Sequence, residues 1–184
     1  MLLFGHLGLG NALSEPFLRP GRPESRSLFP WICLGTLLPD LIDKPLFHLL
    51  KIVNRANLIE SVGLITSTRT VGHTALFLIA SAVFASFTKG RARFAVTLGV
   101  ATHLLLDNLL DQWVGASPSS AFMALIFPLS DGRFSEAPFD DLEGHLALSV
   151  TRLEALSAEA VGLVLFLYFY FQFRKYRQNA QLGK

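Results

Sequence analysis

At the centre of the chain, Thr102-His103-Leu104-Leu105-Leu106-Asp107 lies inside an apolar run that extends from Phe94 to Val114. Side chains four residues apart project from one face of an α-helix, so the run predicts a helix with His103 and Asp107 side by side. This helix is almost long enough to cross a bilayer. An ionisable pair is expensive to bury inside such a segment and therefore indicates a functional site, although a polar pair on the surface of a soluble bundle has the same spacing.

The composition is that of a membrane protein. Hydrophobic residues make up 51% of the 184 residues and charged residues 16%, below the roughly 25% charged residues of an ordinary soluble domain. A single cysteine, Cys33, excludes an internal disulfide and a multi-cysteine zinc site. The net charge of +2 does not indicate nucleic acid as a partner, because the basic residues are clustered near apolar segments. Membrane lipid is the expected partner, and the sequence does not indicate an oligomeric state.

Further apolar segments predict an all-α fold in one membrane-embedded domain, residues 1–184, with about four embedded helices and short re-entrant or interfacial helices. The first segment is too short to span as a straight helix and is expected to be tucked or re-entrant. The second is expected to stop at Pro39, because proline does not continue a helix comfortably. The segments are Leu2–Leu13, Leu28–Leu38, Leu46–Val53, Gly72–Phe87 and Ala155–Phe173.

Basic clusters predict the orientation, because Lys and Arg are enriched in short cytoplasmic loops. They place residues 19–26, 89–93 and the tail 174–184 inside, and residues 54–69 and the connection 117–154 outside. With this topology, polar side chains from separate segments are expected to meet in the outer half of the membrane. They are His6, Asp40, His73, His103 and Asp107.

These residue types favour a divalent metal, Zn, Mn, Fe or Mg. Asp40, His73, His103 and Asp107 are the expected ligands, and His6 and Asp43 are further ligands or supporting groups. The set suffices for one ion or for two about 3.5–4 Å apart, with water activated by the metal and a spare carboxylate taking its proton. Arg69 is expected to contact a phosphate through a bidentate fork.

Each residue also has a simpler interpretation. Asp40 could cap the turn that follows Pro39, and Asp43 could pair with Lys44. His6 could hydrogen-bond backbone groups among the neighbouring glycines. Arg69 could anchor the chain at the level of the lipid headgroups. The spacing of these residues does not decide between the simple roles and a metal site.

Three motifs resemble those of the YdjM-like family, bacterial inner-membrane proteins described from their motifs as metal-dependent hydrolases. The resemblance covers about residues 1–130 and implies metal-site roles for His6, Asp40, His73, His103 and Asp107, with Arg69 in support. The family's tighter Asp-x-Asp is replaced here by Asp40-Leu41-Ile42-Asp43. The motifs are Gly35-Thr36-Leu37-Leu38-Pro39-Asp40-Leu41-Ile42-Asp43, Arg69-Thr70-Val71-Gly72-His73-Thr74 and Thr102-His103-Leu104-Leu105-Leu106-Asp107.

The sequence thus predicts a multi-pass protein of the bacterial inner membrane that acts as a metal-dependent hydrolase. The expected substrate is a phosphoester or lipid-like molecule near the outer face, with Asp43 and Arg69 in catalytic roles and no cofactor beyond the metal. One alternative is an ion- or proton-coupled transporter that uses the same buried histidines and aspartates. Another is a non-enzymatic membrane adaptor with a structural metal, in which residues 117–154 bind a partner.

Overall fold

A computed structural model describes residues 3–18, 23–53, 68–87, 90–115, 120–129, 134 and 151–182. Every regular element among these residues is helical, which confirms the predicted all-α class. The longer helices are α1 (Leu3–Ser14), α3 (Phe29–Val53), α4 (Ala75–Ser86), α5 (Arg91–Trp113) and α8 (Leu153–Leu182). The shorter ones are η1 (Glu15–Leu18), α2 (Pro23–Arg26), η3 (Val71–His73) and α6 (Ser120–Leu125).

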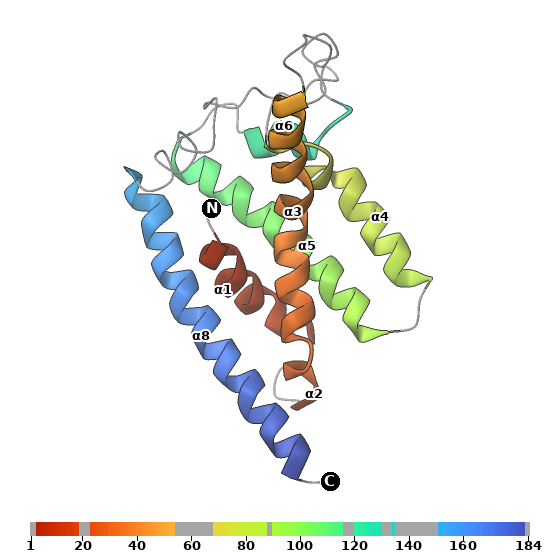
Figure 1. The fold of residues 1–184 in the computed structure, drawn as a ribbon, viewed down its shortest axis with the longest axis vertical. Helices are drawn as coiled ribbons and strands as arrows, with labels where there is room; N and C mark the ends of the chain where they lie inside the picture. The colour runs from red at the N-terminus through yellow and green to blue at the C-terminus, as the bar shows by residue number, and fades with distance from the viewer. Residues whose placement is uncertain are drawn as a thin grey trace.

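Helix α5 is the element against which most of the others pack. Helices α3 and α4 contact it, and α1 lies between α8 on one side and α3 and α5 on the other (Figure 1). The η3 turn lies against α3, at the start of α4. This arrangement packs segments that lie far apart in the sequence, α1, α3, α4 and α6, against α5.

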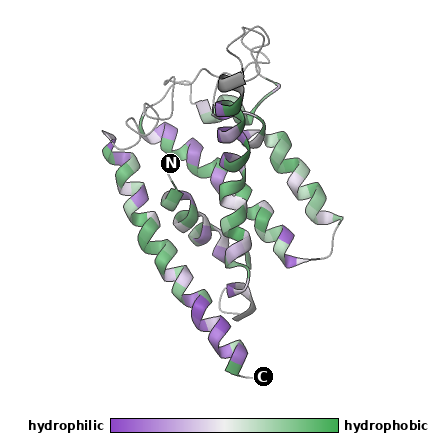
Figure 2. Cartoon of the chain, viewed as in Figure 1, coloured by the Kyte–Doolittle hydropathy of each residue, from purple (hydrophilic) through white to green (hydrophobic). Residues whose placement is uncertain are grey.

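Two of the described helices, α5 and α8, are long and apolar enough to cross a membrane, whereas α4 has only 12 residues. The predicted count of about four embedded helices is therefore not confirmed. In Figure 2 most residues of α4 and of the upper two thirds of α8 have the colour of hydrophobic residues. Large side chains such as Phe84, Val164 and Phe171 are exposed on these helices. Such exposed apolar faces are what a helix presents to lipid.

The prediction that the second segment stops at Pro39 is wrong. Helix α3 runs for 25 residues through both Pro39 and Pro45. A proline inside a helix removes one hydrogen bond and costs about 3 kcal/mol. Packing of α3 against α5, α1 and η3 offsets this local cost. Asp40 and Asp43 therefore belong to the same continuous helix as the residues of α3 that pack on α5.

The described parts of the predicted basic segments lie on the same side of the molecule. Figure 1 shows α2, the first turn of α5 and the last turns of α8 toward the lower end of the view. The predicted cytoplasmic tail is not a segment distinct from the last helix, because residues 174–182 continue α8. Of the predicted outer connection 117–154, the described part holds α6, and most of the remainder lies outside the described residues, as do residues 54–67.

Helices α1 and α8 touch through their backbones. A Cβ built on Gly8 would lie 1.8 Å from the Gly162 carbonyl oxygen, and one built on Gly162 would lie 2.3 Å from the Phe4 carbonyl oxygen. Only glycine allows so close an approach. Small residues at such crossings are typical of helix pairs in membranes.

Replacement of Gly162 by alanine is expected to destabilise the fold by about 1–3 kcal/mol, because the new methyl group can be accommodated only by moving backbone. The measurement is the thermal transition of the purified protein in detergent. Gly90→Ala is the matched control, since nothing lies within 4 Å of a Cβ at Gly90. Equal transitions for the two variants would contradict the close α1–α8 contact.

Candidate metal centre

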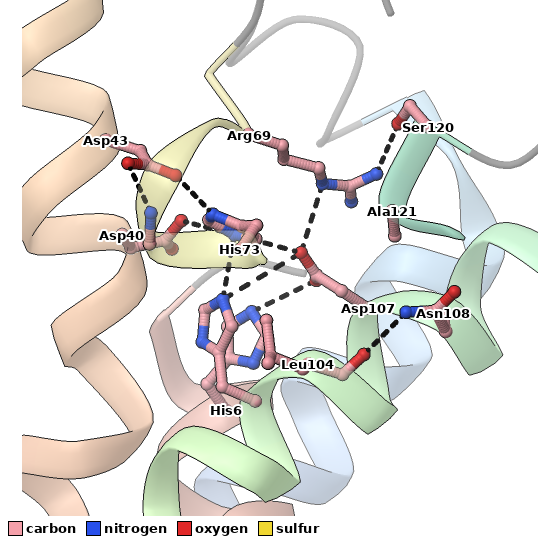
Figure 3. A network of polar contacts seen from close by, with 12 residues as sticks. His6, Asp40, Asp43, Arg69, His73, Leu104, Asp107, Asn108, Ser120 and Ala121 are labelled. Carbon is pink, nitrogen blue, oxygen red and sulfur yellow. Dashed lines mark hydrogen bonds and ion pairs between the residues drawn. The ribbon is translucent and has the colours of Figure 1, made fainter. Parts of the chain in front are cut away.

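Five of the predicted site residues meet in one buried cluster, shown in Figure 3. His6, His73, His103 and Asp107 are each at most 3% exposed, and the Asp40 side chain is 18% exposed. They come from four elements: His6 from α1, Asp40 from α3, His73 from η3, and His103 and Asp107 from α5. We call this set the His/Asp cluster.

The imidazoles of His73 and His103 face each other through their Nε2 atoms, which are 3.1 Å apart. His103 Nδ1 lies 2.7 Å from the Thr36 carbonyl oxygen, which can only accept, so this nitrogen donates. His73 Nδ1 lies 2.7 Å from Asp43 Oδ2 and donates in the same way. In neutral imidazoles with Nδ1 protonated, Nε2 carries a lone pair. Two lone pairs therefore point at each other across 3.1 Å.

Carboxylate oxygens surround the same point. Asp107 Oδ2 lies 3.5 Å from His73 Nε2 and 3.9 Å from His103 Nε2, and Asp40 Oδ1 lies 3.7 Å from His73 Nε2. Burial alone would lower the pKa of His73, but the nearby carboxylates of Asp107 and Asp43 outweigh burial and raise the pKa. The arrangement thus favours positive charge between the two rings, as a shared proton or as a metal ion.

Asp43 lies behind His73 and not among the groups that face the shared point. It is fully buried, and Oδ2 accepts hydrogen bonds from the Thr70 amide at 2.7 Å and from His73 Nδ1. Oδ1 accepts from the Gly72 amide at 2.9 Å. A Cβ on Gly72 would lie 2.8 Å from the Pro39 carbonyl oxygen. The glycine therefore lets η3 lie directly on α3, with Asp43 fixing the orientation of the His73 ring.

Arg69 connects the cluster to the next turn of α5 and to α6. Its Nε lies 3.1 Å from Asp107 Oδ2, and its Nη1 lies 2.8 Å from Asp111 Oδ2 and 2.6 Å from Ser120 Oγ. Asp111 also accepts from the Ala121 amide. Burial alone would lower the pKa of Arg69, but the carboxylates of Asp107 and Asp111 raise it above its usual value. The guanidinium that was expected to meet a phosphate thus binds carboxylates here.

Asp40 has an ion-pair partner that neither of the simpler interpretations of Asp40 and Asp43 predicted. Its Oδ2 lies 2.6 Å from Lys44 Nζ, one helical turn later. The sequence analysis considered Lys44 as a partner of Asp43, but the structure pairs it with Asp40. Because Asp40 Oδ1 faces His73 Nε2 at the same time, the ion pair with Lys44 and a place in the cluster are compatible.

His6 enters the cluster from α1. Its ring stacks on that of His103, with centroids 3.9 Å apart and planes at 16°. His6 Nε2 lies 3.4 Å from Asp107 Oδ1. The other nitrogen, Nδ1, is buried and has no hydrogen-bond partner among the described residues. The alternative interpretation of His6, a hydrogen bond to neighbouring backbone groups, is therefore not seen.

Glu159 is a supporting residue that the sequence analysis did not identify. Its carboxylate accepts hydrogen bonds from the Phe4 amide at 2.8 Å and the Gly5 amide at 3.0 Å. It therefore caps the first turn of α1, which carries His6. The sequence feature that could have identified Glu159 is that it is the single acidic residue inside the apolar segment Ala155–Phe173. Burying such a residue is expensive unless it has a partner.

Replacement of Glu159 by alanine is expected to cost about 0.5–2 kcal/mol, as loss of an N-terminal cap does. The variant should also bind divalent metal more weakly, because α1 is no longer held in place. Thermal unfolding and metal titration of the detergent-purified protein would measure both effects. Glu154→Ala, one turn nearer the start of α8, is the control and should change neither. An unchanged Glu159→Ala variant would contradict the capping role.

The cluster fits a divalent metal ion. Two overlapping sets, His73–His103–Asp107 and His6–Asp40–His103, each offer ligand atoms that lie within 4.8 Å of one another. A shared proton would need only two of these groups, whereas the cluster aims imidazole nitrogens and carboxylate oxygens at one region. Histidines whose other nitrogen donates to a carboxylate or a carbonyl are typical of metal ligands. Mixed imidazole and carboxylate donors suit Zn, Mn or Fe.

No curated protein and no solved structure gives a significant match. One family model, described as YdjM inner membrane protein, matches residues 1–179 and so extends well beyond the region of resemblance found in the sequence motifs. The chain therefore belongs to the YdjM inner membrane protein family.

Proposed function

We propose that the protein is a membrane-bound, metal-dependent hydrolase that acts on a phosphoester or lipid-like substrate near the outer face of the bacterial inner membrane. The observation that carries this proposal is the pair of Nε2 atoms of His73 and His103, 3.1 Å apart, with Asp107 Oδ2 beside them. A bound Zn, Mn, Fe or Mg ion would supply Lewis-acid activation of water and of a substrate oxygen.

The residues of the site would have two kinds of role, as ligands of the ion and as groups that position those ligands. His73, His103 and Asp107 hold the ion, while Asp43 and the Thr36 carbonyl orient the two rings. Arg69 offsets the charge of Asp107 and keeps its carboxylate in place. Asp43 and Arg69, predicted as catalytic, would therefore act as positioning residues. In the hydrolysis of a phosphoester, a water oxygen forms a new bond to phosphorus and the ester P–O bond breaks. The water proton passes through a carboxylate of the cluster to the leaving alcohol.

Two features support a lipid-like substrate reached from the outer face. The side chains of Asp40 and Arg69, each 18% exposed, form the accessible edge of the cluster. An apolar cavity of about 270 Å³ is lined by Phe77 and Phe127 and by Val71 and Thr74, which lie two residues before and one residue after His73 in the sequence. In Figure 1 the start of α4, next to η3, lies away from α2 and the last turns of α8, and basic segments are typical of the cytoplasmic side.

The proposal is tested on the detergent-purified full chain, stripped with a chelator and reloaded with Zn, Mn, Fe or Mg. Phosphoester hydrolysis should return with at least one metal. Asp107→Asn is expected to lose metal and activity together, because the substitution removes a negative ligand between two imidazoles and Arg69. His48→Ala, a histidine on α3 packed against Phe47, is the control and should retain both. Stoichiometric metal without turnover of phosphate or carboxylic esters would contradict the proposal and favour a structural metal.

A further inference from the structure

The stacking of two histidines in the cluster limits which ligands one ion can share. Metal ions bind histidine in the plane of the ring, along the nitrogen lone pair, at about 2.0–2.1 Å from zinc. The His6 and His103 planes are only 16° from parallel, and centroids 3.9 Å apart require that the rings lie face to face. Planes arranged in this way do not meet near the two Nε2 atoms. One ion therefore cannot lie in both ring planes.

His73 and His103 are arranged differently. Their planes are 67° apart, and their Nε2 atoms are 3.1 Å apart, so both lone pairs can converge on one ion. His103 has no second lone pair to offer, because its Nδ1 donates to the Thr36 carbonyl. His103 thus serves the ion that it shares with His73, and His6 is left without a place in that coordination shell.

Asp107 turns one oxygen toward each of these positions. Oδ2 faces His73 Nε2 at 3.5 Å, and Oδ1 faces His6 Nε2 at 3.4 Å (Figure 3). A carboxylate used in this way bridges two ions. Asp40 groups with His6 as a possible ligand and is the most exposed carboxylate of the cluster. The face-to-face spacing of the rings, 3.9 Å, matches the separation of about 3.5–4 Å between the ions of two-metal sites.

We infer that the cluster is a two-metal centre, in which His73, His103 and Asp107 Oδ2 bind one ion and His6, Asp40 and Asp107 Oδ1 bind a second. This inference rests on the proposed function and narrows its substrate to phosphoesters. Two adjacent ions stabilise both the attacking and the leaving oxygen of an in-line displacement at phosphorus.

Metal content tests the inference without relying on activity. The purified full chain is stripped, loaded with Mn²⁺, freed of excess metal and analysed for manganese per chain. Wild-type protein should hold two ions and give the electron paramagnetic resonance signal of an exchange-coupled pair. His6→Ala should hold one ion and give an uncoupled signal. His48→Ala is the matched control and should hold two.

The outcomes separate the two proposals. One ion per wild-type chain together with phosphoester turnover would overturn the second site and leave the proposed hydrolase standing. No bound metal and no turnover would overturn both. Two ions retained in a folded His6→Ala variant would overturn the role of His6. If His6→Ala does not yield folded protein, the coupled or uncoupled signal of the wild type decides the question.

Discussion

Replacement of His103 by alanine is expected to remove the metal ion that it shares with His73 and to abolish hydrolysis. His103 is fully buried at the centre of the cluster and contacts His73, while its ring stacks on His6. Its removal takes one of three ligands from the first ion, so the loss in affinity should exceed the roughly 10–100-fold that follows from removing a hydrogen-bond partner of a ligand.

The same variant should change how stability responds to metal. A ligand that binds only the folded state stabilises it by about 2.7 kcal/mol at a hundredfold excess over Kd. Added metal should therefore raise the thermal transition of the wild-type protein and of His48→Ala by more than that of His103→Ala. A His103→Ala protein that holds as many ions as the wild type and gains as much stability from metal would contradict the assigned ligand set.

Replacement of Asp43 by asparagine is expected to weaken metal binding about 10–100-fold while the chain remains folded. All three hydrogen bonds that Asp43 accepts, from Thr70, Gly72 and His73, come from the loop and turn that carry His73. An amide has only one oxygen, so its NH₂ group would face an N–H donor. The His73 ring would then lose its fixed orientation although no ligand is removed.

Metal titration of the stripped protein measures this effect. Glu15→Gln, on the exposed η1 turn, is the control for loss of one negative charge and should leave the affinity unchanged. Weak binding in Asp43→Asn with wild-type kcat at saturating metal would confirm a positioning role. An unchanged affinity with a large loss of kcat would instead indicate that Asp43 contacts the substrate directly.

The part of the site that sequence could predict is the part fixed by local geometry. His103 and Asp107 are four residues apart in a long apolar run, and helical spacing alone places them on one face. The meeting of these residues with His6 and His73 was inferred from polar residues at matching depths in separate segments. The structure confirms that two of them meet, because His73 Nε2 lies 3.1 Å from His103 Nε2. The side of the membrane on which the cluster lies stays a prediction.

The features that sequence could not give depend on tertiary packing. Helix α3 continues through Pro39 because its contacts with α5 and η3 outweigh the local cost of a proline inside a helix. The sequence shows the proline but not these contacts. The orientation of His103 depends on a backbone carbonyl, that of Thr36, which no residue pattern reveals. Glu159 lies 153 residues after His6 and caps its helix only because glycines let α1 and α8 touch.

The central claim is that the imidazoles of His73 and His103, carried by η3 and α5, bind one divalent ion. X-ray absorption at the zinc edge of the zinc-loaded, detergent-purified chain tests it most directly. The account predicts nitrogen ligands with the outer scattering of imidazole rings, reduced in His73→Ala and in His103→Ala. A zinc environment made only of oxygen, or one identical in the wild type and both variants, would contradict it.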